Sequence, residues 1–590
     1  MNFIKNVLAT FVGIVLFCMM SFFLMLIVGA IASFGSSSST KSTKNNSVIK
    51  LDLEKVSNDY GGTTYIEDFD YKETHNDGLI NVLQAIDYAK NDDKIKGITL
   101  ENNVTTLGTT QRKAIVDKLA EFKKTGKFVV AYADYYSQAE YYLASVADTI
   151  YMNPMGTIDF KGLVSEVLYM KDLQEKTGIK MEVIRHGKYK SAVEPFLQQH
   201  MSDDNREQLT VLLNSIWDSY VNDISKNRKI AVSNLNDIAT NLNARNAKLA
   251  LQNKLIDKIA YIDEYQNGIK KALDIKYDDD INEIEILDYI DDVNLNMKKI
   301  SAKDQIAVIF AQGEIQDGEG SLNTIGEGSI NRALKAARTN DKIKAIVLRV
   351  NSPGGSALTS DIIWREIELT KKVKPVIVSM GDVAASGGYY IACNANRIFA
   401  EPGTITGSIG VFGMVPNFKA VADKYGVNAE AVKTHANADG YSVFEEMTPK
   451  YKETLTESIE IIYDTFISRV AEGRKMDKTK VDEYAQGRVW TGTMAKQIGL
   501  VDELGSLDDA IAYAAKLVKT DDYKVSLYPE YRIEFADLFR KYLGVSVAGI
   551  KEDAIKKEIG LENYQLLQHM NYLNQSKGVQ ALMPYNLNIK

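Results

Sequence analysis

The sequence predicts an α/β protein in which one N-terminal transmembrane helix precedes two tandem copies of the same domain. Apolar β-branched runs alternate with amphipathic stretches, a pattern typical of parallel sheets covered by helices. Similar segments recur at a nearly constant separation, and one long uncharged run lies near the N-terminus. The chain has 590 residues, 45% of them hydrophobic, so several domains can each bury a core.

Residues 7–34 form a run of 28 residues without a charged side chain, more than the roughly 20 apolar residues that cross a bilayer. A cleavable signal peptide has a shorter apolar core of about 7–15 residues, so this length favours an uncleaved anchor. Ala30-Ile31-Ala32 nevertheless resembles a cleavage site. The flanking lysines are too few to fix the orientation. We expect residues 1–46 to form the anchor and a Ser-rich, flexible tether.

The repeat is visible in two pairs of segments. DKIKGITL begins at Asp93 and DKIKAIVL at Asp341, so their separation is 341 − 93 = 248 residues. YYLAS from Tyr141 and YYIAC from Tyr389 have the same separation, 389 − 141 = 248. Such self-similarity indicates a duplicated domain. We expect the first copy at residues 47–296, the second at 297–548 and a C-terminal extension at 549–590.

The second copy shows most clearly where a site would form. Three of its segments are predicted to be buried strands and two to be amphipathic helices: 306–310, 346–350 and 376–380, and 330–338 and 360–371. Glycine-rich residues 351–356 and 381–388 directly follow two of these strands. Because ligand sites of parallel sheets collect at the carboxyl ends of the strands, we expect the site at these two loops.

Ser386 is the candidate nucleophile, because it lies in Ala-Ala-Ser-Gly-Gly between a predicted strand and a predicted helix. Small neighbours let a substrate backbone approach, and amides at a helix start stabilise negative charge on a carbonyl oxygen. Gly387 would supply one such amide, and Gly354 or Gly355 the second. Taken alone, the same residues also fit a tight turn packed on a sheet.

A serine hydroxyl is a weak nucleophile and needs a base. Residues 201–434 contain no histidine, and His435 has a counterpart in His186 (435 − 186 = 249), which favours a shared structural role. The alternative base is a lysine made neutral by burial, since an ordinary lysine is protonated near pH 7. Lys190 is the candidate, although its local sequence alone also fits a surface lysine.

Together these residues resemble the long form of the signal peptide peptidase A family, also called protease IV, in the ClpP/crotonase-like superfamily. The motifs that carry the resemblance are GKYKSAVEPF from Gly187, NSPGGS from Asn351 and VAASGGYYIAC from Val383. The resemblance extends over about residues 45–520. It implies that each copy is a ClpP/crotonase-like domain.

The resemblance also implies a function and a set of site residues. Ser386 and Lys190 would form a Ser-Lys dyad, and Ser408 in TGSIG would hold the lysine. The protein would be a serine endopeptidase that degrades cleaved signal peptides and other short apolar peptides through an acyl-enzyme. Its catalytic body would lie on the extracytoplasmic, periplasmic side of the cytoplasmic membrane, and it would form a homotetramer.

The repeat indicates how the two catalytic groups are distributed. Alignment on the Tyr-Tyr pairs puts Gln138 opposite Ser386, and alignment on the histidines puts Asp439 opposite Lys190 (439 − 190 = 249). The first copy therefore has a base without a nucleophile, and the second has a nucleophile without a base. We expect the site to form across an interface, either within one chain or between protomers.

Composition excludes other classes of function. Acidic residues outnumber basic ones, 78 to 70, so no overall positive field favours nucleic acid. With two cysteines, five histidines and no CxxC or HExxH motif, we expect no metal and no other cofactor. Two alternatives stay open: a crotonase-like acyl-CoA enzyme, which acyl-CoA turnover would reveal, and a noncatalytic membrane scaffold, which labelling by a fluorophosphonate would contradict.

Overall fold

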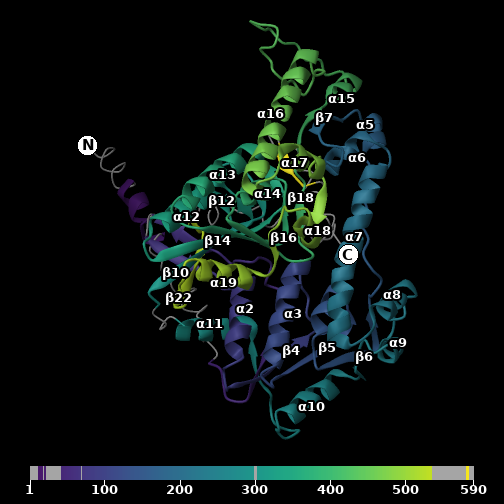
Figure 1. Ribbon diagram of the computed structural model, residues 1–590, viewed down its shortest axis with the longest axis vertical. Coiled ribbons are helices and arrows are strands. Elements are labelled where there is room, and N and C mark those ends of the chain that lie inside the picture. The colour runs from purple at the N-terminus through teal and green to yellow at the C-terminus, as the bar shows by residue number, and fades with distance from the viewer. Residues whose placement is uncertain are drawn as a thin grey trace.

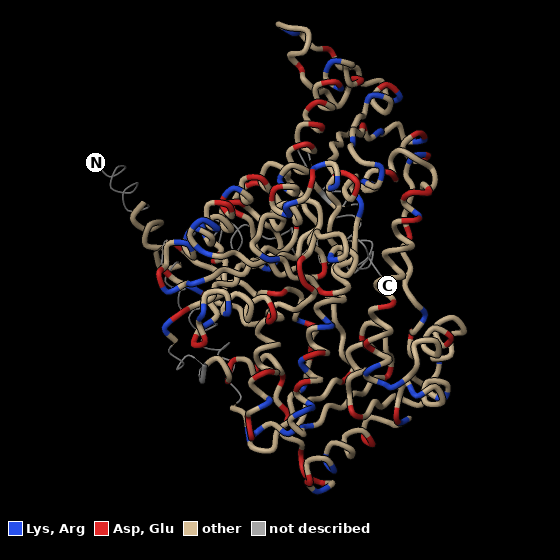
Figure 2. Tube along the Cα trace, viewed as in Figure 1, with Lys and Arg blue, Asp and Glu red and all other residues tan. Residues whose placement is uncertain are grey.

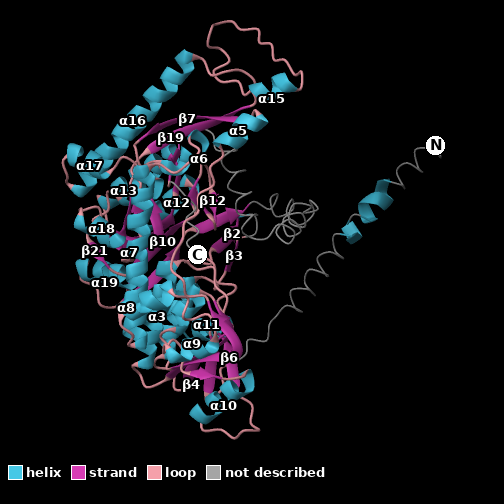
Figure 3. Cartoon of the chain, turned by 90° about the vertical axis from the view of Figure 1, so that its right-hand side faces the viewer, coloured by secondary structure: helices cyan, strands magenta, loops and turns pink. Residues whose placement is uncertain are grey.

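The computed structural model describes residues 11–17, 19–21, 42–67, 70–297, 302–533 and 580–583. The predicted membrane span, residues 7–34, lies largely outside this part of the chain, and its described residues are helical and exposed (Figure 3). Within the described ranges, no helix has both the length and the apolar character needed to span a bilayer. Of the expected C-terminal extension, only residues 580–583 are described.

The first copy is built on a six-stranded sheet with the order β8-β6-β5-β4-β1-β9, in which every neighbouring pair is parallel. Its strands are β1 (Ser47–Lys50), β4 (Ile95–Glu101), β5 (Phe128–Tyr136), β6 (Thr149–Ile158), β8 (Lys258–Ile259) and β9 (Asn282–Glu285). The central strands are apolar and mostly buried, as expected for a parallel sheet with covered faces.

The second copy repeats this topology. Its parallel path β22-β10-β14-β16-β17-β21 matches β9-β1-β4-β5-β6-β8 strand for strand, and β18 and β20 extend the sheet beyond β16. The strands are β10 (Asp304–Gln312), β14 (Ile343–Ser352), β16 (Val376–Ala385), β17 (Arg397–Ala400), β18 (Ile405–Gly407), β20 (Val489–Thr491), β21 (Glu503–Leu504) and β22 (Tyr523–Tyr528). The three predicted strands of this copy are confirmed.

Helices cover both sheets, and Figure 1 shows α2, α3 and α19 between the two copies. The helices of the first copy are α2 (Leu79–Ala89), α3 (Thr109–Lys123), α4 (Gln138–Ala144), α5 (Lys171–Thr177), α6 (Glu194–Leu197), α7 (Asp203–Arg228), α8 (Val232–Thr240), α9 (Ala247–Gln252), α10 (Ile262–Ala272) and α11 (Ile286–Met297). Those of the second are α12 (Glu327–Thr339), α13 (Ala357–Lys371), α14 (Gly387–Ala392), α15 (Lys419–Lys424), α16 (Pro449–Arg474), α17 (Lys478–Tyr484), α18 (Gly492–Gln497) and α19 (Leu507–Leu517). Both predicted amphipathic helices, α12 and α13, are confirmed.

The long helices α7 and α16 show how closely the copies correspond. Each has 26 residues and begins after a hydroxyl side chain, Ser202 or Thr448, that caps the backbone of its first turn. Each ends at a lysine in the left-handed conformation. Acidic and basic side chains are interspersed along both helices and over the rest of the surface (Figure 2).

A third sheet joins the two copies, with the order β12-β13-β11-β15-β24-β19-β7. Its strands are β7 (Lys180–His186) from the first copy, β11 (Glu314–Ile315), β12 (Gly320–Ser321), β13 (Thr324–Ile325), β15 (Gly354–Ser356) and β19 (Val411–Asn417) from the second, and β24 (Gln580–Leu582). A small sheet of β2 (Thr63–Ile66), β3 (Tyr71–Thr74) and β23 (Glu530–Ile533) also spans the copies.

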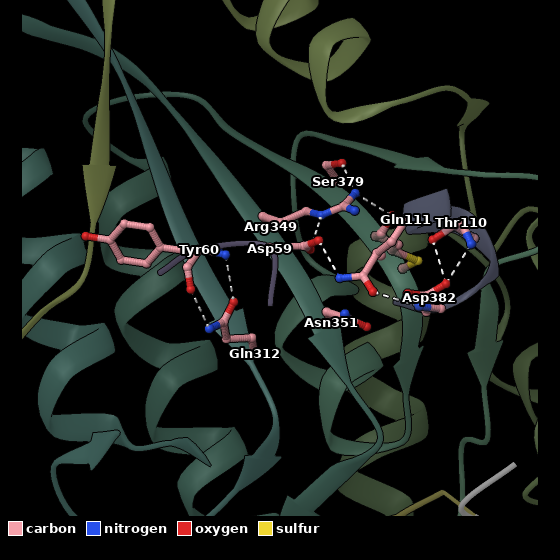
Figure 4. A network of polar contacts seen from close by, with 12 residues as sticks. Asp59, Tyr60, Thr110, Gln111, Gln312, Arg349, Asn351, Ser379 and Asp382 are labelled. Atoms are coloured by element: carbon pink, nitrogen blue, oxygen red, sulfur yellow. Dashed lines mark hydrogen bonds and ion pairs between the residues drawn. The ribbon is translucent and has the colours of Figure 1, made fainter. Parts of the chain in front are cut away.

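A buried polar network fixes the relative position of the copies (Figure 4). The Arg349 guanidinium on β14 donates to Asp59 of the first copy at 2.8 Å, and Gln111 donates to the other Asp59 oxygen at 2.8 Å. Asp382 on β16 accepts from the Thr110 amide at 2.6 Å. Burial raises the pKa of Asp382, and the hydrogen bonds from Thr110 oppose this effect. Since Asp382 lies four residues before Ser386, the network holds the nucleophile strand against the first copy.

Candidate active site

Ser386 lies where β16 ends and α14 begins, as the sequence predicts, and the helix starts at the next residue, Gly387. Its φ of 54° and ψ of −116° are unusual for a residue with a side chain. The Ser386 amide donates to the Gly407 carbonyl at 2.8 Å and so secures this turn. The glycine that follows is closely packed, since a Cβ on Gly387 would lie 2.8 Å from Ser360 Oγ and 3.1 Å from the Ala581 carbonyl oxygen.

The register between β7 and β19 brings Lys190 to the second copy. The two strands are antiparallel with His186 opposite Val411. Lys190 follows the end of β7 by four residues, and Ser408 precedes the start of β19 by three. The chain segments that carry Lys190 and Ser408 therefore lie side by side, close to the end of the nucleophile strand.

The structure brings the three predicted residues together within one chain. Lys190 Nζ lies 2.8 Å from Ser386 Oγ, 3.0 Å from the Ser408 carbonyl oxygen and 3.0 Å from Ser408 Oγ. All three residues are fully buried. Ser386 and Lys190 come from different copies and are 196 residues apart in the sequence.

Burial alone holds the pKa of Lys190 well below its ordinary value. The hydrogen-bond geometry suits the neutral amine, which has two N–H donors and one lone pair. The two Ser408 oxygens can take both N–H groups, and the lone pair then faces the Ser386 hydroxyl. A neutral Lys190 in this position can accept the proton of Ser386.

Two glycines, Gly487 and Gly410, pack directly against Lys190. A Cβ on Gly487 would lie 2.6–2.7 Å from backbone and Cβ atoms of Lys190, and one on Gly410 would lie 3.2 Å from its Cδ. Gly487 also has a φ of +80°, which favours glycine. The Tyr189 amide donates to the Gln486 carbonyl at 2.8 Å, so the two segments are also joined by their backbones.

The predicted oxyanion glycines converge beside Ser386. A Cβ on Gly354 would lie 2.7 Å from the Gly387 amide nitrogen, so these two residues are immediate neighbours. Gly354 and Gly355 have φ values of +101° and +152°. The Gly354 amide donates to Ser352 Oγ at 3.2 Å, so Gly355 remains the candidate for the second donor.

The residues opposite the dyad in the repeat have other roles. The Gln138 side chain accepts from the Gly162 amide and donates to the Gly162 carbonyl, both at 3.1 Å, and so fixes a loop. Asp439 pairs with Lys433 in an exposed segment. The expected shared role of the histidines is wrong. His186 lies 2.8 Å from Glu460 and stacks on Tyr463, whereas His435 is exposed beside Thr434.

Sequence reasoning missed the residue that supports the Lys190 loop. Glu194 is fully buried and accepts from the Ser202 amide and hydroxyl, each at 2.8 Å. Tyr169 donates to the same carboxylate at 2.9 Å. The signal was present, because Glu194 is a charged residue between Val193 and Pro195 within the lysine motif, where a buried anchor is a plausible interpretation.

A serine at the carboxyl end of a parallel strand, with a buried lysine against its hydroxyl, defines the class of serine hydrolases. The chain belongs to peptidase family S49, a family of serine proteases, whose model matches residues 121–276 and 368–521. The two matches start 368 − 121 = 247 residues apart, which confirms the duplication. The Clp protease model matches residues 298–404, in agreement with the expected fold.

Three relatives are similar to most of the chain. Protease 4 of Haemophilus influenzae is 37% identical over 491 residues, which cover 81% of this chain and 79% of that protein. Protease 4 of Salmonella typhi is 38% identical over 463 residues, covering 77% and 74%. The chloroplastic serine protease SPPA of Arabidopsis thaliana is 33% identical over 500 residues, covering 83% and 72%. Family membership favours a peptidase over an acyl-CoA enzyme.

Proposed function

We propose that the protein is a membrane-anchored endopeptidase that cleaves signal peptides with a dyad of Ser386 and Lys190. The observation that carries this proposal is the 2.8 Å contact between Lys190 Nζ and Ser386 Oγ at a fully buried position. Ser408 positions the lysine through its two oxygens. Burial lowers the pKa of Lys190 well below its ordinary value, which supports a neutral base at physiological pH.

The reaction proceeds in two stages. Ser386 Oγ attacks the peptide carbonyl carbon while its proton passes to Lys190, and the proton then moves to the amine that leaves. Water next attacks the acyl-enzyme, with Lys190 again taking and returning a proton. The Gly387 and Gly355 amides hold the negative oxygen of each tetrahedral intermediate.

The substrate is an extended, apolar peptide such as a cleaved signal peptide. A peptide that lies along β15 would form backbone hydrogen bonds, which depend little on sequence. The uncharged run at residues 7–34 supports an anchor in the membrane where such peptides are released. The catalytic body would then lie on the extracytoplasmic side.

We propose assembly into a homotetramer, and two unpaired counterparts of β7 and β19 support a head-to-tail contact between chains. With an offset of 248, β19 corresponds to residues 163–169 of the first copy and β7 to residues 428–434 of the second. Neither segment forms a strand, and both expose apolar side chains, among them Leu168 and Val432. Residues 163–169 of one chain could pair with residues 428–434 of the next chain in the way that β19 pairs with β7. Repeated head to tail, this contact would close a ring in which no such segment stays unpaired.

Hydrolysis of a synthetic signal peptide by the full chain in detergent tests this function. We expect Ser386→Ala to lose at least about a thousandfold in kcat/KM, because the nucleophile is removed. Gln138→Ala removes the residue at the equivalent position of the other copy and should keep activity within about threefold. Equal loss in both variants would contradict the assignment of Ser386.

A further inference from the structure

Strand β24, from the C-terminal end of the chain, lies between two strands that border Ser386. It pairs antiparallel with β15, with Ala581 opposite Gly355, and it also pairs antiparallel with β19. The Met583 amide continues this ladder by donating to the Pro353 carbonyl at 2.7 Å. A short segment that adds a strand between two edges is bound as peptides are bound by β-augmentation.

The Ala581 carbonyl lies beside the glycines of the proposed oxyanion site. A Cβ on Gly354 would lie 2.1 Å from the Ala581 oxygen, and one on Gly387 would lie 3.1 Å from the same oxygen. The Ala581 carbonyl therefore lies at the proposed oxyanion site, where the carbonyl of a substrate would react with Ser386.

The side chains of Ala581 and Met583 are enclosed as those of a bound substrate would be. Ala581 is 0% exposed, so only a small side chain fits at this position. Met583 is 4% exposed and belongs to an apolar cluster with residues of both copies. The buried members of this cluster are Leu212, Ile216, Ala385, Ile405, Val489 and Met583. Since successive side chains of a strand point to opposite faces, Ala581 and Met583 lie on the same face.

We propose that the peptide bond between Ala581 and Leu582 is a cleavage site of the protein's own Ser386. This inference rests on the proposed peptidase function and adds a specific substrate to it. The proposal also predicts the substrate preference of the protein. A small residue such as Ala581 would precede the cleaved bond, and an apolar residue such as Met583 would be the second residue after that bond. With β24 in place, Ser386 is fully buried, so an added peptide must displace the segment.

The self-cleavage follows the proposed chemistry. Ser386 Oγ forms a bond with the Ala581 carbonyl carbon, and its proton passes to Lys190. The bond to the Leu582 nitrogen breaks, and Lys190 returns the proton to that nitrogen, which leaves as an amine. Water then attacks the Ala581 ester, one of its protons returns through Lys190 to Ser386 Oγ, and Ala581 ends as a carboxylate.

Mass spectrometry of the purified full chain tests the proposal. After trypsin digestion, the uncut segment yields residues 578–590, whereas the cut protein yields residues 578–581 and, from the released peptide, 582–590. We expect the cut form in the wild-type protein and only the uncut form in Ser386→Ala. Cleavage at the same bond in both proteins would assign it to another protease and overturn the proposal.

The same wild-type sample is assayed on a synthetic signal peptide, so that failure of the self-cleavage proposal can be distinguished from failure of the proposed peptidase function. Peptide hydrolysis with residues 578–590 left intact would overturn the self-cleavage and leave the proposed function standing. Self-cleavage without signal-peptide hydrolysis would support this inference and contradict the proposed substrate. Loss of both activities would overturn both.

Two methionines give a matched pair of variants. Met583→Asp places a charge in the apolar cluster and should slow self-cleavage about tenfold or more. Met155→Asp makes the same change at a residue that is 88% exposed on β6, and should leave the rate unchanged. Ala581→Trp, which cannot fit the enclosed position, should abolish cleavage at this bond. Unchanged self-cleavage in Met583→Asp and Ala581→Trp would overturn the proposal.

Discussion

At the scale of single residues, the burial that suits Lys190 to the proposed role of base also lowers the stability of the fold. A lysine that is fully buried loses its hydration, and the only cause acting on its pKa is this desolvation, which lowers it. Such a residue stabilises the fold less than an apolar side chain of similar length would. The same property suits it to the proposed role of base, because burial disfavours the protonated amine.

Replacement of this side chain should therefore raise stability in a pH-dependent way. Below about pH 10.4 the unfolded state binds a proton that the native Lys190 does not, so the wild-type free energy of unfolding rises with pH over the interval from the lowered pKa to about 10.4. Lys190→Met removes this linkage. We expect a higher Tm than wild type at pH 7, with a difference that shrinks towards pH 10. A pH-independent difference in calorimetry would contradict a neutral native lysine.

At the scale of elements, the β7–β19 pairing brings the Lys190 segment to Ser386 and Ser408. The two strands share a seven-residue register, and both carry a catalytic segment just beyond the end at which His186 faces Val411. Gly487 then determines how close the lysine segment approaches the second copy. The site thus depends on a backbone contact as much as on the catalytic side chains.

A pair of glycine variants tests this contact. Gly487→Ala and Gly126→Ala both place a side chain at a φ of +80° to +87°, which costs about 1–2 kcal/mol in each case. Only Gly487 has Lys190 atoms within 3 Å of the added carbon, whereas Gly126 has no atom within 4 Å. We expect Gly126→Ala to lose Tm through backbone strain alone, Gly487→Ala to lose more because of the added contact with Lys190, and kcat/KM to fall about a hundredfold only in Gly487→Ala. Equal activity in both variants would show that the contact with Gly487 does not position Lys190.

At the scale of the whole molecule, both copies of the domain contribute residues to the candidate site. The first copy supplies Lys190 through β7, the second supplies Ser386 and Ser408, and the network around Asp59 and Arg349 holds the copies together. The other possible joint, between residues 428–434 and 163–169 of the next chain, would bring Asp439 towards Gln138. Neither residue is a nucleophile or a base of the dyad, so a ring would alternate active and inactive joints.

Charges in the unpaired segments should prevent assembly. Leu168 is 57% exposed in the first copy, and Leu168→Lys should shift the sedimentation coefficient of the full chain in detergent from that of a tetramer to that of a monomer. Val373→Lys changes a residue that is 62% exposed on another face and serves as the control. A wild-type protein that sediments as a monomer would contradict the proposed ring.

The extent to which the sequence predicts this molecule follows from the range of the interactions. Strands β14 and β16 were predictable because runs of β-branched residues are a local pattern typical of buried strands. Ser386 was predictable because the glycines that follow it are also visible in the local sequence. The partnership of Ser386 with Lys190 required a resemblance, since no local pattern relates residues 196 positions apart. The pairing of β24 was not predictable, because backbone hydrogen bonds leave no mark on a three-residue sequence. The histidine prediction failed because β19 pairs with β7, and the His435 segment has no strand partner within the chain.

The rate of labelling by a fluorophosphonate measures the activation of Ser386 by Lys190 directly. The wild-type protein should be labelled at Ser386, at a rate that rises with pH through a pKa well below 10.4 as Lys190 loses its proton. Lys190→Arg keeps a cation that cannot accept a proton, so its labelling should fall at least about a hundredfold at every pH up to 10. Labelling of Lys190→Arg at the wild-type rate and with the wild-type pH profile would show that Lys190 does not activate Ser386.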